Sequence, residues 1–297
     1  MTSPPPVPSA GPFEQSHIHD RQATGGDILA DFPRLREIAA KRAATRSQWK
    51  MLMIVCIIAA IPLILLTVVA PPLFLLPLLA IVGAIVFGVL MSRIPVYDLR
   101  QFDAAEQIIK LASADAAADA PLTLRLDMRP HDCGEKLTGT GKAGGWDVKY
   151  YISPWLTLTG RFLDGSRFDI RLITRFQSRK KWKRSRSGKQ KRKTKTKESL
   201  RVYVGLRIKA EKYAHVEKLA QGAAPAVKLP PEVRLRNLGI TADSLDLTVD
   251  AGGWTATGLE ATPTGQTNAP HLVALMLLSL YQVLNLSKAI DKRGHAA

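Results

Sequence analysis

Twelve lysines and arginines gathered in residues 177–197 give this chain its plainest chemical signal. No acidic residue lies between Asp169 and Glu198, and without the twelve the formal net charge would fall from +17 to +5. The segment therefore dominates the electrostatic field of the protein and predicts an anionic partner. The predicted anion-binding residues are Arg179, Lys180, Lys181, Lys183, Arg184, Arg186, Lys189, Lys191, Arg192, Lys193, Lys195 and Lys197.

Several partners fit such a segment. Anionic lipid headgroups are favoured, because a polybasic segment tethered near a bilayer gains about 1 kcal/mol per basic residue at the surface. Nucleic acid and an acidic protein are the alternatives, and a solvated loop without a dedicated partner also fits. The only aromatic residue in the segment, Trp182, suits a lipid interface or a nucleic-acid base equally well. We predict a binding or scaffolding role that needs no cofactor.

A second cluster, His131-Asp132-Cys133, contains residue types that bind metals or act as nucleophiles. An enzyme with a site around these residues is therefore an alternative function. Metal sites need three or four converging ligands, and no second cluster with ligand spacing accompanies this one. We therefore predict no metal site and no catalytic residue. The motif at residues 17–20, His-Ile-His-Asp, lies in a polar terminal segment with nothing to organise a site.

The glycine-rich stretch at residues 139–145 is similar in composition to a phosphate-binding loop but lacks its spacing. Lys136 stands where the first glycine is needed, and Ala143 stands where a serine or threonine would hold magnesium. We interpret the stretch as a connection between strands.

The elements that must position the basic segment are β-strands. Leu122, Leu124 and Leu126 alternate with polar residues, and the same period of two recurs in residues 146–152, 155–162, 168–176 and 199–209. Asp164-Gly165 is a turn signal, and a last strand pair is predicted around Gly252-Gly253, from residues 245–249 and 254–259. The basic segment then connects two strands as a long hairpin loop, mobile until it meets an anion.

Helical patterns flank these strands. Residues 98–118 predict an amphipathic helix, and residues 269–292 predict a helix that is apolar nearly all round. The apolar part of the second helix, residues 272–286, is either a core helix or a third membrane segment; the core reading is favoured because the run is short for a span. The fold class is α+β: an antiparallel sheet covered by helices, preceded by a membrane hairpin.

Residues 51–91 contain no charged side chain. This stretch is too long for one membrane helix and long enough for two. Pro71-Pro72 divides the stretch, so we predict a transmembrane hairpin with spans at residues 51–70 and 73–91. A face of small residues, Ala80, Ala84 and Gly88, permits close helix packing within one chain or in an oligomeric pore.

The remaining organisation follows from these spans. Residues 1–26, rich in proline and polar residues, predict a disordered tail, and residues 27–50 predict a basic juxtamembrane helix. Residues 92–297 form the predicted cytoplasmic α+β domain.

The charge distribution predicts that both termini and the main domain are cytoplasmic. Six basic residues lie in residues 34–50, whereas the connection between the spans has none. Reporter fusions at Ser3 and at Ala297 should both report the cytoplasm, and a fusion at Pro72 should report the opposite side. Opposite sides for the two termini would contradict the two-span topology.

Overall fold

The computed structural model describes residues 11–69, 75–184, 188–213, 215–256 and 266–294, which form two compact units. The first unit takes the chain up to Phe32 and from Asp98 onward, and the second is Pro33–Tyr97. The helices are α1 (Gly11–Ser16), α2 (Gly25–Val69), α3 (Leu75–Arg93), α4 (Leu99–Ala114), α5 (Ala220–Ala223) and α6 (Ala269–Gly294), with short 3-10 turns η2 (Gly134–Lys136), η3 (Ala210–Lys212), η4 (Glu217–Leu219) and η5 (Ala224–Ala226). The strands are β1 (Ile18–Ala23), β2 (Leu122–Asp127), β3 (Leu137–Ala143), β4 (Trp146–Arg161), β5 (Arg167–Arg184), β6 (Gln190–Arg207), β7 (Val233–Ile240), β8 (Ser244–Ala251), β9 (Gly253–Thr255) and β10 (Gln266–Asn268).

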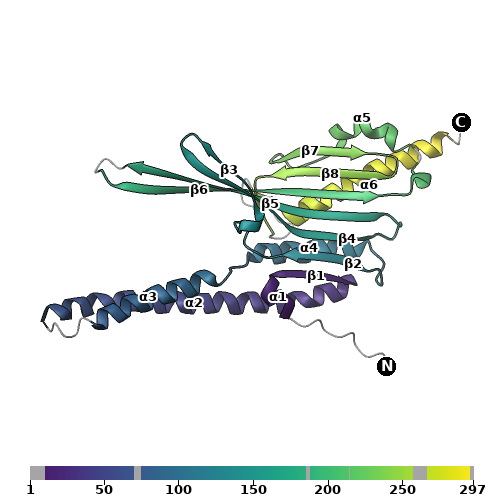
Figure 1. Cartoon of the computed structure of the whole chain (residues 1–297). Coiled ribbons are helices and arrows are strands. Elements are labelled where there is room, and N and C mark those ends of the chain that lie inside the picture. Colours follow the sequence, from purple (N-terminus) through teal and green to yellow (C-terminus); the bar gives the residue numbers. More distant parts are fainter. Residues whose placement is uncertain (1–10, 70–74, 185–187, 214, 257–265, 295–297) are drawn as a thin grey trace, which may run out of the picture. The chain divides into compact units, whose positions relative to one another are not determined.

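An eight-stranded antiparallel sheet forms the centre of the first unit, in the order β1-β2-β4-β5-β6-β8-β7, with β3 paired to β4. Helices α4 and α6 pack on one face of it (Figure 1). The predicted α+β class, with an antiparallel sheet and helices, is therefore confirmed. We refer to the face without these helices as the uncovered face.

The core of this unit lies between the sheet and α6. Leu172, Val202 and Leu247 are fully buried on adjacent strands, and Met276 and Leu280 of α6 are fully buried as well. Burial of alternate strand residues follows from the period of two, since every second side chain points to the same face. The C-terminal helix, predicted as either a core or a membrane helix, thus packs in the core of the first unit.

The N-terminal segment departs from the prediction. Residues 11–26 are not a disordered tail in the structure: they form α1, the edge strand β1 and the start of α2. Strand pairing is made by the backbone, so a polar strand can join a sheet edge without apolar side chains. Asp31 accepts a hydrogen bond from Arg21 of β1, and Thr24 caps α2 by accepting from the Asp27 amide at 3.2 Å. Residues 1–10 lie outside the described residues.

The predicted domain limits change accordingly. The juxtamembrane helix predicted at residues 27–50 is the first part of the single helix α2, which begins at Gly25. Its residues up to Phe32 belong to the same compact unit as the sheet, so that unit is not confined to residues 92–297.

The strand pair predicted around Gly252-Gly253 is wrong. Strand β8 pairs with β6 and β7 instead, and β9 pairs in parallel with β10 in a separate small sheet. The periodic pattern marks the strands but contains no information about which strand is the neighbour. The turn predicted at Asp164-Gly165 does form, and Gly165 has positive φ. Residues 139–145, predicted as a connection between strands, are a connection only at Gly144 and Gly145, both with positive φ, because residues 139–143 belong to β3.

The second unit contains two apolar helices that contact each other. Trp49 stacks on Phe87 with ring centroids 5.5 Å apart, and a Cβ built on Gly83 would lie 3.4 Å from the Cys56 sulfur. Gly88 of the small-residue face lies beside Met53. Pro71-Pro72, the predicted break, is outside the described residues.

Among the described residues, three helical segments could cross a membrane by length and composition: Gly25–Leu66, Leu75–Arg93 and Ala269–Ile290. In each of the first two segments only 6% of the most apolar 18-residue stretch is buried, whereas in the third segment the buried share is 44%. This contrast separates the helices of the second unit from the core helix α6.

The involvement of the N-terminal segment in the fold can be tested at Ile28, which is 0% exposed. Ile28→Ala should lower the free energy of unfolding of the first unit by about 2–5 kcal/mol, because it leaves a cavity in a packed core. The measurement is denaturant unfolding of the full chain in detergent, followed by the fluorescence of the buried, stacked pair Trp155 and Trp254. The matched change Ile152→Ala, at a side chain that is 41% exposed, should cost much less. Equal stability of both variants would contradict the placement of Ile28.

Candidate anion-binding surface

Strands β5 and β6 pair without a register shift from Arg167↔Arg207 to Arg184↔Gln190. The predicted mobile loop is therefore, in its described part, a continuation of the two central strands (Figure 1). Residues 177–180 still pair with β4, and residues 181–184 extend past that pairing. We call residues 177–184 together with 190–197 the basic ribbon. Lys189 follows Gly188, whose φ of 78° places it in the left-handed region, and Arg186 lies outside the described residues.

Directly opposed residues of an antiparallel pair point to the same face, so the register sorts the basic side chains. Arg179 opposes Lys195, Lys181 opposes Lys193, and Lys183 opposes Lys191. With Lys197, which opposes Gln177, these make a face of seven basic side chains that we call the lysine face. The other face has only Lys180, Arg184 and Arg192 among the basic residues, together with Trp182, Ser178, Thr194, Thr196 and Gln190.

The lysine face is continuous with the uncovered face of the sheet. In β5, Phe168, Ile170 and Leu172 point into the core, so Arg171 and Arg175 point to the uncovered face. Because no bulge interrupts the β5–β6 pairing, the same alternation leads directly from Arg175 to the lysine face.

Within the described residues, no carboxylate neutralises the ribbon: none of its basic side chains has an acidic group within 4 Å. The nearest acid in sequence, Glu198, accepts a hydrogen bond from the Trp254 indole at 3.0 Å and lies 3.8 Å from Arg100. Like charges directly across a strand pair repel each other, so the ribbon keeps a strong positive potential. Such a potential is available to an external anion.

Neighbouring groups of the β3–β4 hairpin support the ribbon on one side. The Lys181 ammonium donates to the Gly144 carbonyl at 3.3 Å, and the Lys195 ammonium lies 5.8 Å from the centre of the Trp146 ring. At the base of the ribbon a cavity of about 430 Å³ is lined by Tyr150, Arg175 and Lys197, among others. Trp182, on the other face, is 63% exposed.

In the His131-Asp132-Cys133 cluster, the His131 ring packs against an aromatic side chain. The His131 ring lies 4.4 Å from the ring of Phe176 at the base of the ribbon, while Asp132 is exposed. In the part of the chain that the structure describes, no three His, Cys, Asp or Glu side chains come close enough to hold a metal ion.

Buried charges hold the loop that contains this cluster. The Lys136 ammonium donates to the Arg129 carbonyl at 2.9 Å and lies 3.4 Å from the Asp127 carboxylate. Burial opposes ionisation of Asp127, but hydrogen bonds from Arg129 and the charge of Lys136 outweigh it and lower the pKa of this carboxyl group.

The motif at residues 17–20 lies at the start of β1. The His19 ring is 3.3 Å from the Asp31 carboxylate, and burial lowers the pKa of this imidazole although Asp31 opposes the change. His19 and Asp31 thus connect β1 to the first turns of α2.

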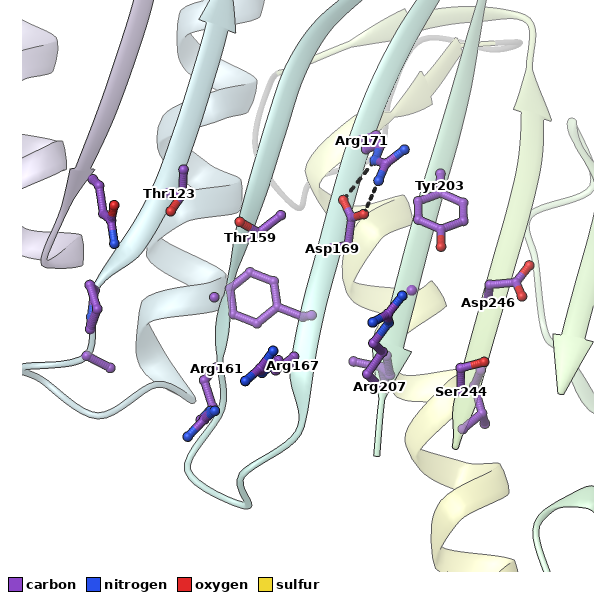
Figure 2. A pocket seen from close by; sticks show the side chains of 18 residues that line it. Thr123, Thr159, Arg161, Arg167, Asp169, Arg171, Tyr203, Arg207, Ser244 and Asp246 are labelled. Carbon is purple, nitrogen blue, oxygen red and sulfur yellow. Dashed lines mark hydrogen bonds and ion pairs between the residues drawn. The ribbon is translucent and has the colours of Figure 1, made fainter. Parts of the chain in front are cut away.

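Sequence reasoning did not single out Arg161, Arg167 and Arg207, which the register places side by side on adjacent strands. They lie at the opposite end of β5 from the ribbon and line a cavity of about 860 Å³ (Figure 2). The alternating pattern of β5 puts Arg167 on a polar face, but its neighbours become visible only once the strand order is known. Comparisons with protein-family models, curated proteins and solved structures gave no match to this chain.

Pairing in the ribbon can be tested by hydrogen exchange of the full chain. Peptides from residues 178–184 and 190–196 should exchange more slowly than a free loop, because strand pairing protects the backbone amides. Raising the salt concentration from about 0.05 M to about 0.5 M should slow the exchange further, since screening weakens the repulsion between opposed lysines.

Peptides from the core part of β5, residues 168–174, are the internal control and should show little dependence on salt. Exchange of the ribbon at the rate of an unstructured loop at every salt concentration would contradict the pairing.

Proposed function

We propose that this chain is an integral membrane protein whose basic ribbon binds the anionic headgroups of membrane lipids, in a binding or scaffolding role. The observation that carries the proposal is the sorting of seven basic side chains onto one face of a paired ribbon without acidic partners within the described residues. A flat array of ammonium and guanidinium groups is suited to a flat anionic surface.

The membrane part of the proposal rests on the second unit. Its helices direct large apolar side chains outward: Ile58 is 61% exposed and Leu79 is 65% exposed. Exposed apolar surface over the length of two helices is unfavourable in water and favourable in lipid. We therefore propose two spans, at residues 51–70 and 73–91, arranged as a transmembrane hairpin.

The proposed orientation is cytoplasmic for both termini and for the sheet domain. Basic residues precede the first span and follow the second, at Lys50 and Arg93. The cytoplasmic leaflet of a bilayer is the anionic one, so this orientation exposes the ribbon to the lipids that it would bind.

The strength of such binding can be estimated. Eight residues in each arm give the ribbon a length of roughly 26 Å, enough to touch several headgroups. Each basic residue at an anionic surface contributes about 1 kcal/mol, so loss of three should weaken binding by roughly 100-fold at low salt. A membrane anchor in the same chain also raises the effective concentration of the surface.

A second candidate partner is double-stranded nucleic acid. The major groove of DNA admits a two-stranded β-ribbon, and the basic ribbon is paired in that way. The lysines would then contact phosphates, and Trp182 would lie on the other face of the ribbon. Lipid is favoured because the apolar helices would hold the ribbon near a bilayer.

The test compares two variants that each remove three positive charges from the same ribbon. The first variant, Lys183→Gln, Lys191→Gln and Lys193→Gln, changes the lysine face, and the second, Lys180→Gln, Arg184→Gln and Arg192→Gln, changes the other face. The full chain, held in nanodiscs of zwitterionic lipid, is mixed with vesicles containing phosphatidylserine, and binding is measured by co-flotation. The lysine-face variant should lose at least tenfold in affinity, and the other variant should lose clearly less.

Two controls define the outcome. Vesicles without anionic lipid should not bind, and binding should weaken steeply as salt rises. Equal loss in both variants would show that net charge alone matters and would contradict the role of the lysine face. A short DNA duplex that the vesicles cannot displace would favour nucleic acid instead of lipid.

A further inference from the structure

Three arginines form a row across the uncovered face, at the end of the sheet remote from the ribbon. Arg161 of β4 is directly opposite Arg167 of β5, and Arg167 is directly opposite Arg207 of β6. The next residue in the row is Ser244 of β8. Figure 2 shows the three arginine side chains near one end of their strands, with Asp169 and Tyr203 further along β5 and β6; all five line the cavity.

Like charges at adjacent register positions destabilise a sheet unless something neutralises them. Among the described residues, none of these three guanidinium groups has a carboxylate within 4 Å. The two acids that line the same cavity interact elsewhere: Asp169 pairs with Arg171, and Asp246 accepts a hydrogen bond from Asn237 at 2.9 Å. The row is therefore a concentration of positive charge that the fold itself leaves uncompensated.

The Tyr203 ring lies over Gly205 in the lining of the cavity, and it fits there because Gly205 has no side chain. A Cβ atom there would lie 2.6 Å from the Tyr203 hydroxyl oxygen, so a larger residue would displace this ring. The Arg171 guanidinium lies 5.3 Å from the centre of the Tyr203 ring, within reach of a cation–π interaction. Burial, assisted by the charges of Asp169 and Asp246, raises the pKa of Tyr203, which keeps its hydroxyl protonated and able to donate.

Charge and size together define the class of ligand. Four arginines and two aspartates line the cavity, which leaves two net positive charges, the charge that a phosphate monoester neutralises. Arginine is the side chain best suited to bind two phosphate oxygens at once. The volume of about 860 Å³ is far larger than one phosphate group, so there is room for an organic part.

We propose that this cavity binds a phosphate monoester of a hydroxyl-bearing compound, with Arg161, Arg167 and Arg207 on the phosphate. Asp246, which uses one oxygen for Asn237, accepts a hydrogen bond from a hydroxyl group of the organic part. The site is distinct from the ribbon: Arg167 and Gln177 are ten positions apart on β5, or roughly 33 Å. Neither the lipid-binding proposal nor the membrane topology is needed for it.

The experiment is isothermal titration of the full chain in nanodiscs of zwitterionic lipid. The probes are glycerol phosphate, inorganic phosphate, glycerol and a short-chain phosphatidic acid, in which the same phosphate monoester is carried on a lipid. Glycerol phosphate should bind saturably, and more tightly than inorganic phosphate, whereas glycerol should not bind. If the phosphatidic acid binds more tightly than glycerol phosphate, the phosphate monoester that the cavity binds belongs to a lipid headgroup.

The principal variant is Arg167→Gln, which should lose at least tenfold in affinity for glycerol phosphate. Its melting temperature should stay unchanged or rise, because the substitution relieves repulsion within the row. Arg167→Lys keeps the charge but not the planar guanidinium group, so its affinity for glycerol phosphate should lie between those of the unchanged protein and Arg167→Gln. If Arg167→Gln fails to fold, Arg207→Gln makes the same test on the neighbouring strand.

Two further variants test whether the binding of glycerol phosphate depends only on net charge and whether it occurs at the ribbon. Arg234→Gln removes one exposed positive charge of β7 outside the cavity, and it should leave the affinity for glycerol phosphate unchanged. The lysine-face variant should also leave this affinity unchanged, whatever its effect on vesicle binding. Absence of saturable binding, equal affinity for inorganic phosphate, or an equal loss in Arg234→Gln would overturn the proposal.

Discussion

The uninterrupted pairing of β5 with β6 is the constraint on which the remaining structure depends. Eighteen opposed pairs run from Arg167↔Arg207 to Arg184↔Gln190 without a bulge. Because side chains alternate with a period of two, a single bulge would exchange the two faces beyond it. Because the register is unbroken, the core face of the sheet is continuous with the side of the ribbon that contains Trp182. The uncovered face is continuous with the lysine face.

Electrostatics follows from this division of the sheet. One face is filled by Leu172, Val202 and Leu247 under the helices, so the charged residues of the same strands have only the other face. Some of these charges pair locally, as in Arg201 with Asp250 at 2.7 Å. At the two ends of β5, in the basic ribbon and the arginine row, the described residues show no ion pair that would neutralise the positive charge. Both proposed anion sites are found there, and each end has its own geometry: an extended flat face in the ribbon and a cavity at the arginine row.

The apolar helices show that composition and burial are separate properties. Helix α6 and the helices of the second unit are all apolar enough to cross a membrane. Leu272, Met276 and Leu280 of α6 are fully buried because the sheet offers them an apolar surface. The most apolar 18-residue stretches of α2 and α3 are only 6% buried, so the protein itself covers little of their apolar surface.

The sequence by itself determined the local features. These are the period-two strands, the turn at Asp164-Gly165, the apolar stretch at residues 51–91, the α+β class and the concentration of charge in residues 177–197. Only the tertiary structure decided which strands are neighbours. It brought β1 to the sheet edge, paired β8 with β6 and β7, sorted ten of the twelve basic residues between two faces, and placed Arg161, Arg167 and Arg207 in one row. The physical reason is that hydrophobic periodicity and turn chemistry act over a few residues, whereas strand partners are selected by backbone pairing and core packing across more than a hundred.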